Sequence, residues 1–207
     1  MTGTFITFEG PEGAGKTTQL ARLAERLRAI GREVVETREP GGTKGGEAVR
    51  AALIATDASW SPVAEALLMN AARDAHLRDV IAPALERGAV VLCDRFSDST
   101  RAYQGGGSDV DPDFLLHLED AVVTRRPDVT LIFDLPVEEG LSRAMARGAA
   151  DRFEQKGPAY HARVAEAFRD IAKSAPHYAL VDASGSMDVV EARIVDHLRD
   201  HLPGLKL

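Results

Sequence analysis

The chain has 207 residues, 44% of them hydrophobic and 28% charged, with a formal net charge of −7. This length suits one domain with a sizeable core, and the composition is that of a soluble globular protein. The negative charge argues against broad nucleic-acid binding, and no run of about 18 apolar residues predicts a membrane span. The first residues lack the pattern of a signal peptide, and the single cysteine, Cys93, cannot form an internal disulfide, so we expect a cytoplasmic protein.

Short apolar segments alternate with amphipathic segments along the whole chain. The apolar segments are rich in Val, Ile, Leu and Phe, which is typical of a parallel sheet covered on both faces. We expect strands at residues 4–9, 32–38, 89–94, 128–135 and 177–183, and helices at residues 16–30, 62–87, 112–124, 137–147, 158–174 and 188–201. The alternation predicts one α/β domain over residues 1–207, a three-layer sandwich with a five-stranded parallel sheet between helices. The glycine-rich stretches 41–47 and 104–108 are expected to be loops within it.

The segment between the first expected strand and the first expected helix, "GPEGAGKT" (10–17), matches the P-loop pattern G-x-x-x-x-G-K-[ST]. Its backbone N–H groups and the following helix N-terminus are expected to hold phosphate oxygens, and Lys16 to reach the β- and γ-phosphates. The hydroxyl of Thr17 is a candidate ligand of Mg²⁺. The pattern therefore predicts a P-loop NTPase-type fold. The candidate ATP-binding residues are Gly10, Pro11, Glu12, Gly13, Ala14, Gly15, Lys16, Thr17 and Thr18.

A P-loop alone does not separate a GTPase, an ATPase motor and a small-molecule kinase. The chain has no N-K-x-D tetrapeptide of the kind that reads guanine. Three further segments, "TREPGGT" (37–43), "DRFSDSTRAYQGGG" (94–107) and "RAMARGAADRFE" (143–154), resemble the bacterial thymidylate kinases in order and spacing, over nearly the entire chain. The resemblance implies transfer of the ATP γ-phosphoryl group to dTMP with Mg²⁺. It also implies a homodimer, for which helix 62–87 is the natural contact surface.

The resemblance also implies an acceptor site. Arg38, at the carboxyl end of an expected strand, suits the 5′-phosphate, and Arg73 should approach the thymine base. Where the family has a phenylalanine that stacks on the base, this chain has Met69, which can equally be ordinary core. Glu12 is expected to accept a hydrogen bond from the deoxyribose 3′-OH, or to restrain Arg38 or Arg95. The candidate substrate-binding residues are Glu12, Arg38, Met69, Arg73, Arg95, Ser99, Thr100, Tyr103 and Gln104.

Further candidate metal-binding and catalytic residues lie at the end of the third expected strand and within residues 143–157. Asp94 is placed to hold Mg²⁺, and Arg95 to bridge the two phosphates, although the two residues could instead form a structural ion pair. The basic segment 143–157 is expected to be a lid. Because the variable P-loop positions carry no basic residue, the chain resembles the thymidylate kinases that supply the catalytic arginine from the lid, with Arg147 as first candidate. The candidate catalytic residues are Glu12, Lys16, Arg95, Arg143, Arg147 and Arg152.

Other interpretations stay open at this point. The lid arginines could be a solvated stripe, and Met69 leaves room for a kinase acting on a deoxynucleoside or on another monophosphate. A regulatory ATPase without an acceptor is a further alternative. Residues 181–186 are expected near the adenine. The histidines show no metal-binding spacing, and Cys93 is expected to be buried and inert.

Overall fold

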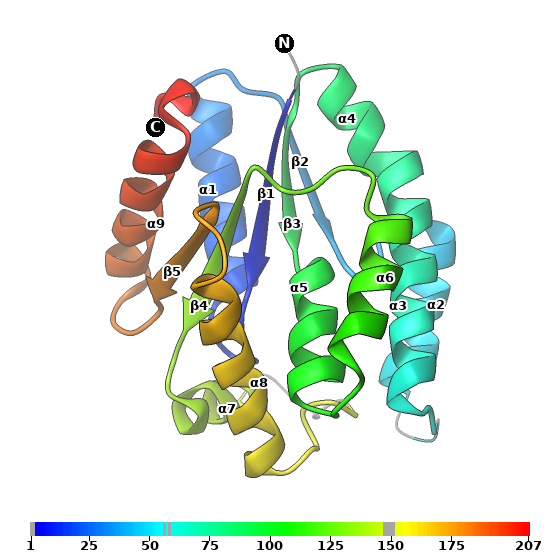
Figure 1. The fold of residues 1–207 in the computed structure, drawn as a ribbon. Coiled ribbons are helices and arrows are strands. Elements are labelled where there is room, and N and C mark those ends of the chain that lie inside the picture. The colour runs from blue at the N-terminus through cyan, green and yellow to red at the C-terminus, as the bar shows by residue number, and fades with distance from the viewer. Residues whose placement is uncertain (1–2, 56, 58, 147–151) are drawn as a thin grey trace.

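The computed structural model describes residues 3–55, 57, 59–146 and 152–207. All neighbouring strands are parallel, and their order in the sheet is β2-β3-β1-β4-β5. Their carboxyl ends therefore meet at one edge, the lower one in Figure 1. The strands are β1 (Thr4–Glu9), β2 (Val34–Arg38), β3 (Val90–Asp94), β4 (Val129–Asp134) and β5 (Tyr178–Asp182).

Helices cover both faces of the sheet, as predicted. They are α1 (Lys16–Ala29), α2 (Lys44–Ile54), α3 (Pro62–His76), α4 (Ala82–Glu86), α5 (Ser97–Thr100), α6 (Pro112–Val122), α7 (Val137–Met145), α8 (Pro158–Ala172) and α9 (Met187–His201). Two π-helical segments, η1 (Leu77–Ile81) and η2 (Arg101–Gly106), continue α3 and α5, and a short 3₁₀ turn, η3 (Pro203–Leu205), follows α9. None of the helices in the described part of the chain is both long enough and apolar enough to cross a membrane.

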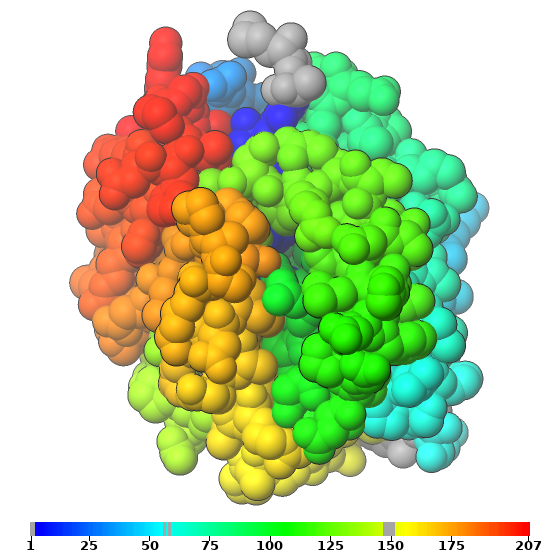
Figure 2. Space-filling model, in the orientation of Figure 1, coloured from blue at the N-terminus to red at the C-terminus, as the bar shows by residue number. Residues whose placement is uncertain are grey.

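Side-chain alternation along the strands divides the core between the two faces. Ile6 and Phe8 of β1 belong to a cluster with apolar residues of α1 and α9. Phe5, which points to the opposite face, packs with residues of η1 and α4, and Ile132 of β4 packs with α8. In Figure 2 the side chains of α8 and α6 cover much of the second face. The predicted three-layer arrangement is confirmed.

Two predicted loops are wrong. The glycines of residues 41–47 predict a loop, but α2 begins at Lys44. The hydroxyl of Thr43 accepts a hydrogen bond from the backbone N–H of Gly46 at 2.9 Å, so the segment holds a helix N-cap despite its glycines.

The second stretch, 104–108, is π-helical through Gly106. A β-carbon added at Gly106 would lie 2.5 Å from the β-carbon of Ala167 in α8, and one at Gly107 would lie 2.5 Å from the Tyr160 ring. These glycines therefore permit close packing of η2 on α8. The glycine-rich composition alone predicts a loop here. The predicted helix 62–87 runs as α3, η1 and α4, with the π-helical segment in the middle.

Candidate active site

The loop between β1 and α1 has the backbone shape that a phosphate cradle needs. Gly13 has φ +70°, and a β-carbon there would lie 1.9 Å from the carbonyl oxygen of Gly140, so only glycine fits. Gly15 caps α1 in the left-handed region with φ +86° and makes no side-chain cap, leaving the first N–H groups of the helix to a ligand.

Lys16 is almost fully buried within this loop. Its ammonium donates to the carbonyl oxygens of Gly10 at 3.0 Å and Pro11 at 2.7 Å. Burial, followed by repulsion from Arg95, lowers the pKa of Lys16 to about 8. Carbonyl oxygens are weaker partners for an ammonium than phosphate oxygens, so a bound triphosphate would compete well for this cation.

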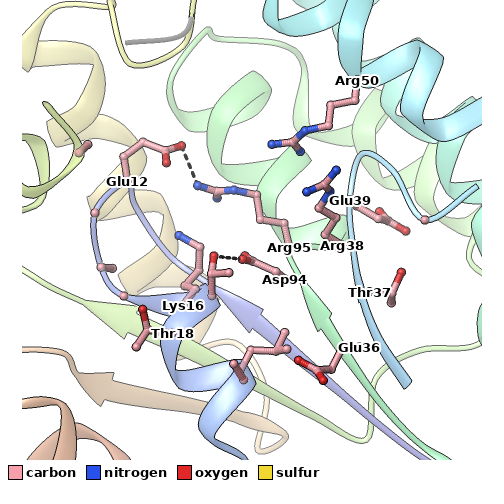
Figure 3. Close-up of a pocket in the computed structure, with 18 of the residues that line it drawn as sticks. Glu12, Lys16, Thr18, Glu36, Thr37, Arg38, Glu39, Arg50, Asp94 and Arg95 are labelled. Carbon is pink, nitrogen blue, oxygen red and sulfur yellow. Dashed lines mark hydrogen bonds and ion pairs between the residues drawn. The ribbon is translucent and has the colours of Figure 1, made fainter. Parts of the chain in front are cut away.

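Thr17 and Asp94 meet at the mouth of the loop. The Thr17 hydroxyl donates to Oδ2 of Asp94 at 2.5 Å, drawn as a dashed line in Figure 3. Within the described ranges no cluster of three or more His, Cys, Asp or Glu side chains suits a metal ion. A hydroxyl and a carboxylate, with phosphate oxygens completing the shell, nevertheless suit Mg²⁺, which is commonly held by few protein ligands.

A cavity of about 840 Å³ lies over the P-loop at the carboxyl edge of the sheet. Figure 3 shows Arg38 and Arg50 lying together on one side of it and Glu12 on the other, with the Arg95 side chain between them. Arg38 pairs with Glu47 at 3.0 Å, and Arg50 donates to the carbonyl oxygen of Pro40 at 3.2 Å. Sequence reasoning missed Arg50, because it stands on α2, the helix that the glycine-rich stretch concealed.

Arg95 and Glu12 form an ion pair between the P-loop and the end of β3. Nη2 of Arg95 lies 2.7 Å from Oε1 of Glu12, and the Tyr103 hydroxyl donates to the same oxygen at 2.9 Å. The Arg95 guanidinium also stacks over the Tyr103 ring, 4.9 Å from its centroid. This geometry agrees with the expectation that Glu12 is a charged partner of Arg95.

Glu9, the last residue of β1, is a buried carboxylate beneath the site that sequence reasoning did not select. Its Oε1 accepts from the backbone N–H of Phe96 at 2.7 Å and of Ser99 at 3.1 Å, and its Oε2 accepts from the Ser99 hydroxyl at 2.6 Å. Burial, reinforced by Asp98, raises the pKa of Glu9 to about 7. Glu9 therefore ties the start of the P-loop to the segment that follows β3.

A smaller cavity of about 110 Å³ adjoins the large one. Arg73 lies at its wall, 2% exposed, and donates through Nε to Glu39 at 2.8 Å and through Nη2 to Thr100 Oγ1 at 3.1 Å. Met69 lines the cavity and also packs against the cluster around α8, so it contributes to the core, and its contact with a base stays a prediction. Other predicted residues at this cavity are Glu12, Arg95, Ser99, Thr100, Tyr103 and Gln104, and Glu39 and Phe153 join them without having been predicted.

Comparison with known proteins supports one family. The family model described as thymidylate kinase matches residues 8–194. The chain belongs to the thymidylate kinase family. It is 54% identical over 197 residues to a thymidylate kinase of Caulobacter vibrioides, covering 94% of this chain and 95% of that one. It is 57% identical over 186 residues to a thymidylate kinase of Pseudomonas fluorescens, covering 88% and 89%. The crystal structure of thymidylate kinase from Ehrlichia chaffeensis matches with a TM-score of 0.79 at 36% identity, over 96% of this chain and 99% of that one.

The resemblance that the motifs carried, and with it the prediction of an enzyme of this family, is thus confirmed. The structure also locates two of the three arginines expected in the lid. Arg143 on α7 pairs with Glu139 at 2.5 Å and borders a cavity of about 230 Å³. Gly15, Ala183 and Gly185 border the same cavity, so the 181–186 segment lies beside the P-loop, and its contact with the adenine stays a prediction.

Arg152 lies at a different place from Arg143. Its Nη1 contacts Oε1 of Glu65 at 2.7 Å, and its Nε donates to the carbonyl oxygen of Leu53 at 3.0 Å. Both partners belong to α2 and α3, beside the small cavity. Arg147 lies outside the described residues. A contact of Arg152 with the ATP phosphates therefore stays a prediction, and this side chain lies near the small cavity instead.

Proposed function

We propose that this member of the thymidylate kinase family transfers the γ-phosphoryl group of ATP to dTMP, giving dTDP and ADP. One observation carries the proposal. The cavity over the P-loop and the small cavity beside Arg73 share the same wall, formed by Glu12, Glu39, Arg50 and Arg95. A donor triphosphate on the P-loop and an acceptor in the small cavity would therefore bring their phosphates together at this wall.

The donor side would act by position and charge. The P-loop N–H groups and the N-terminus of α1 would bind the ATP phosphates, with the Lys16 ammonium turning from the loop carbonyls to the phosphate oxygens. Thr17 and Asp94 would hold Mg²⁺, which when bound neutralises charge on the β- and γ-phosphates. Arg143 and the 181–186 segment would border the adenine end of the ATP.

The acceptor side would hold dTMP by its phosphate and its sugar. Arg38 and Arg50 would grip the 5′-phosphate, and Arg95 would lie between the two reacting phosphates. Glu12, already oriented by Arg95 and the Tyr103 hydroxyl, would accept a hydrogen bond from the 3′-OH. An oxygen of the dTMP phosphate attacks the γ-phosphorus while the bond to the β–γ bridging oxygen breaks, and this phosphate anion needs no strong base.

We further infer that residues 143–157 act as a lid on a single domain spanning 1–207, with Arg147 as the arginine that stabilises the transferring group. A homodimer is supported by exposed apolar side chains on two neighbouring helices. Val63 and Leu67 of α3 are 44% and 48% exposed, and Leu116 of α6 is 42% exposed. Exposed apolar side chains on packed helices are candidates for burial in a protein–protein contact.

An acceptor panel tests the proposal. Initial rates with ATP and Mg²⁺ would be measured for dTMP, dUMP, dCMP, AMP and thymidine by coupling ADP release to NADH oxidation. We expect dTMP to have the highest kcat/KM and ATP hydrolysis without acceptor to be negligible. Phosphorylation of thymidine with dTMP ignored would contradict the proposal, as would ATP turnover that no acceptor changes, the behaviour of a regulatory ATPase.

A further inference from the structure

Glu65 is a buried carboxylate that no step of the proposed reaction uses. It lies in the first turn of α3 and is 1% exposed. Its Oε2 accepts from Nε2 of Gln104 at 2.9 Å, and its Oε1 contacts Nη1 of Arg152 at 2.7 Å. Both partners lie far away in the chain, so one carboxylate holds two side chains in place beside the small cavity.

The contact with Glu65 decides which way the Gln104 amide faces. A carboxylate oxygen only accepts hydrogen bonds, so the amide group must present its nitrogen to Glu65. The carbonyl oxygen of Gln104 is then directed away from Glu65. Gln104 itself is 1% exposed and lines the small cavity, where its carbonyl oxygen can accept a hydrogen bond from a ligand.

Arg73 supplies a donor in the same cavity. A guanidinium has five N–H groups. Among the described residues, one N–H of Arg73 goes to Glu39, one to Asn70, and two to Phe96 and Thr100, which together account for four. In that part of the chain, the second N–H of the Arg73 Nη1 atom has no partner. Arg73 and Gln104 both line the small cavity, so a base bound there would lie within reach of both side chains.

We propose that Glu65 determines base specificity by locking the Gln104 amide, so that the cavity offers an acceptor beside the donor of Arg73. This arrangement is complementary to a pyrimidine with a carbonyl group next to a ring N–H, as in thymine. It rejects cytosine, which carries an amino group next to an unprotonated ring nitrogen. Glu65 is thus a positioning residue that acts through Gln104, and the inference rests on the proposed function.

The test compares two acceptors that differ only in this pattern, dTMP and 5-methyl-dCMP. Both keep the methyl group, so the ratio of their kcat/KM values reports the hydrogen-bond pattern alone. In Glu65→Gln the residue can donate as well as accept, and the Gln104 amide is free to turn over. We expect the dTMP preference to fall by about tenfold or more, as when a buried hydrogen bond changes partner.

Two companion variants keep the test decisive. The double variant Glu65→Gln/Arg152→Met removes both charges, so that no unpaired arginine is left buried, and the same loss of preference is expected. Asp74→Asn makes the same change of charge on the exposed side of α3, where Asp74 is 63% exposed, and should leave the ratio as it is in the wild type. Folded Glu65 variants that lose rate equally with both acceptors, or that keep the wild-type ratio, would overturn the inference.

A measurement on the unaltered protein covers the case in which neither Glu65 variant folds. The side-chain NH₂ protons of Gln104, assigned by their loss in Gln104→Met, should exchange slowly with solvent both before and after dTMP is added. Fast exchange, or movement of these protons onto the bound base, would overturn the inference. Failure of the wild type to phosphorylate dTMP would instead reject the proposed function itself, so the two failures are distinguishable.

Discussion

The donor side and the acceptor side of the proposed site are built in opposite ways. The donor side is a run of neighbouring residues, 10–18, that would hold phosphate mainly through backbone N–H groups. The acceptor side gathers Glu39, Met69, Arg73, Gln104 and Phe153 from separate parts of the chain around one small cavity. Its polar side chains are buried and hydrogen-bonded, Arg73 to Glu39 and Thr100 and Gln104 to Glu65, so a change at one of them disturbs its partners.

This difference has an energetic consequence. A loop that binds through its backbone tolerates substitution at the positions between its glycines, and its shape is set by local backbone conformation. Buried, connected polar side chains are stable only when every member keeps its partner, since an unpaired buried charge is costly. We therefore expect donor-side changes to alter activity with little effect on stability, and acceptor-side changes to alter both.

The largest effect is expected from Lys16→Ala on the donor side. Loss of the one side-chain cation of the P-loop should lower kcat/KM by about 10³-fold or more, because catalysis depends on charge neutralisation at the phosphates. The free energy of unfolding should hardly change, since the Lys16 ammonium bonds only to loop carbonyl oxygens among the described residues. Steady-state kinetics and urea unfolding of the same preparations check both statements, and a variant that unfolds readily would remove the contrast between the two sides.

Arg73→Met on the acceptor side should give the largest loss of stability. It leaves the Glu39 carboxylate, which is 3% exposed, without its arginine, and breaking a buried pair in this way costs about 3–5 kcal/mol. The matched control is Arg28→Met, which breaks the exposed pair with Glu36 at 2.6 Å and should cost less than about 1 kcal/mol. The free energy of unfolding of both variants would be measured by urea unfolding. Equal losses would show that the buried Arg73 pair stabilises the fold no more than the exposed Arg28 pair.

Glu12→Gln lies at the border between the two sides and should affect the acceptor. The amide removes the charge that Arg95 and the Tyr103 hydroxyl hold in place. We expect kcat/KM for dTMP to fall by about 10²-fold, with the Kd of ATP changed by less than about threefold. Calorimetric titration with each nucleotide separates the two effects. A fall in ATP affinity alone would place Glu12 on the donor side.

The two sides also differ in how far the sequence predicts them. The places of Lys16 and Thr17 could be predicted, because a contiguous motif positions its own residues. The sequence did not predict that Arg50, Glu65 and Phe153 lie at or beside the small cavity. Their places there depend on α2, on η2 and on the packing of η2 against α8. The glycines of both stretches indicated loops, whereas one segment has a threonine N-cap and the other needs small residues for close packing. The layers of the fold were predictable from strand–helix alternation, and side-chain networks were not.

Glu9 joins the two sides, since it ends β1 and bonds to residues that follow β3. Its pKa is raised from 4.5 to about 7 by burial and Asp98, against the opposing effects of Ser99 and Arg95. A carboxyl with a raised pKa in the folded state contributes stability that is fully present below about pH 4.5 and is lost as the pH rises through about 7. The wild type should therefore lose stability between about pH 5 and pH 8 relative to Glu9→Gln, by on the order of 2 kcal/mol.

Glu9→Gln is the smallest of these changes and the most informative about the junction. The glutamine side chain that it introduces would be the same size, keep an acceptor for the backbone N–H groups of Phe96 and Ser99, and carry no titrating proton. Urea unfolding of both proteins at several pH values gives the difference in free energy as a function of pH. A difference that stays flat from about pH 5 to pH 8 would mean that Glu9 titrates normally. The P-loop would then be joined to the acceptor side by hydrogen bonds whose strength does not depend on a buried, protonated carboxyl.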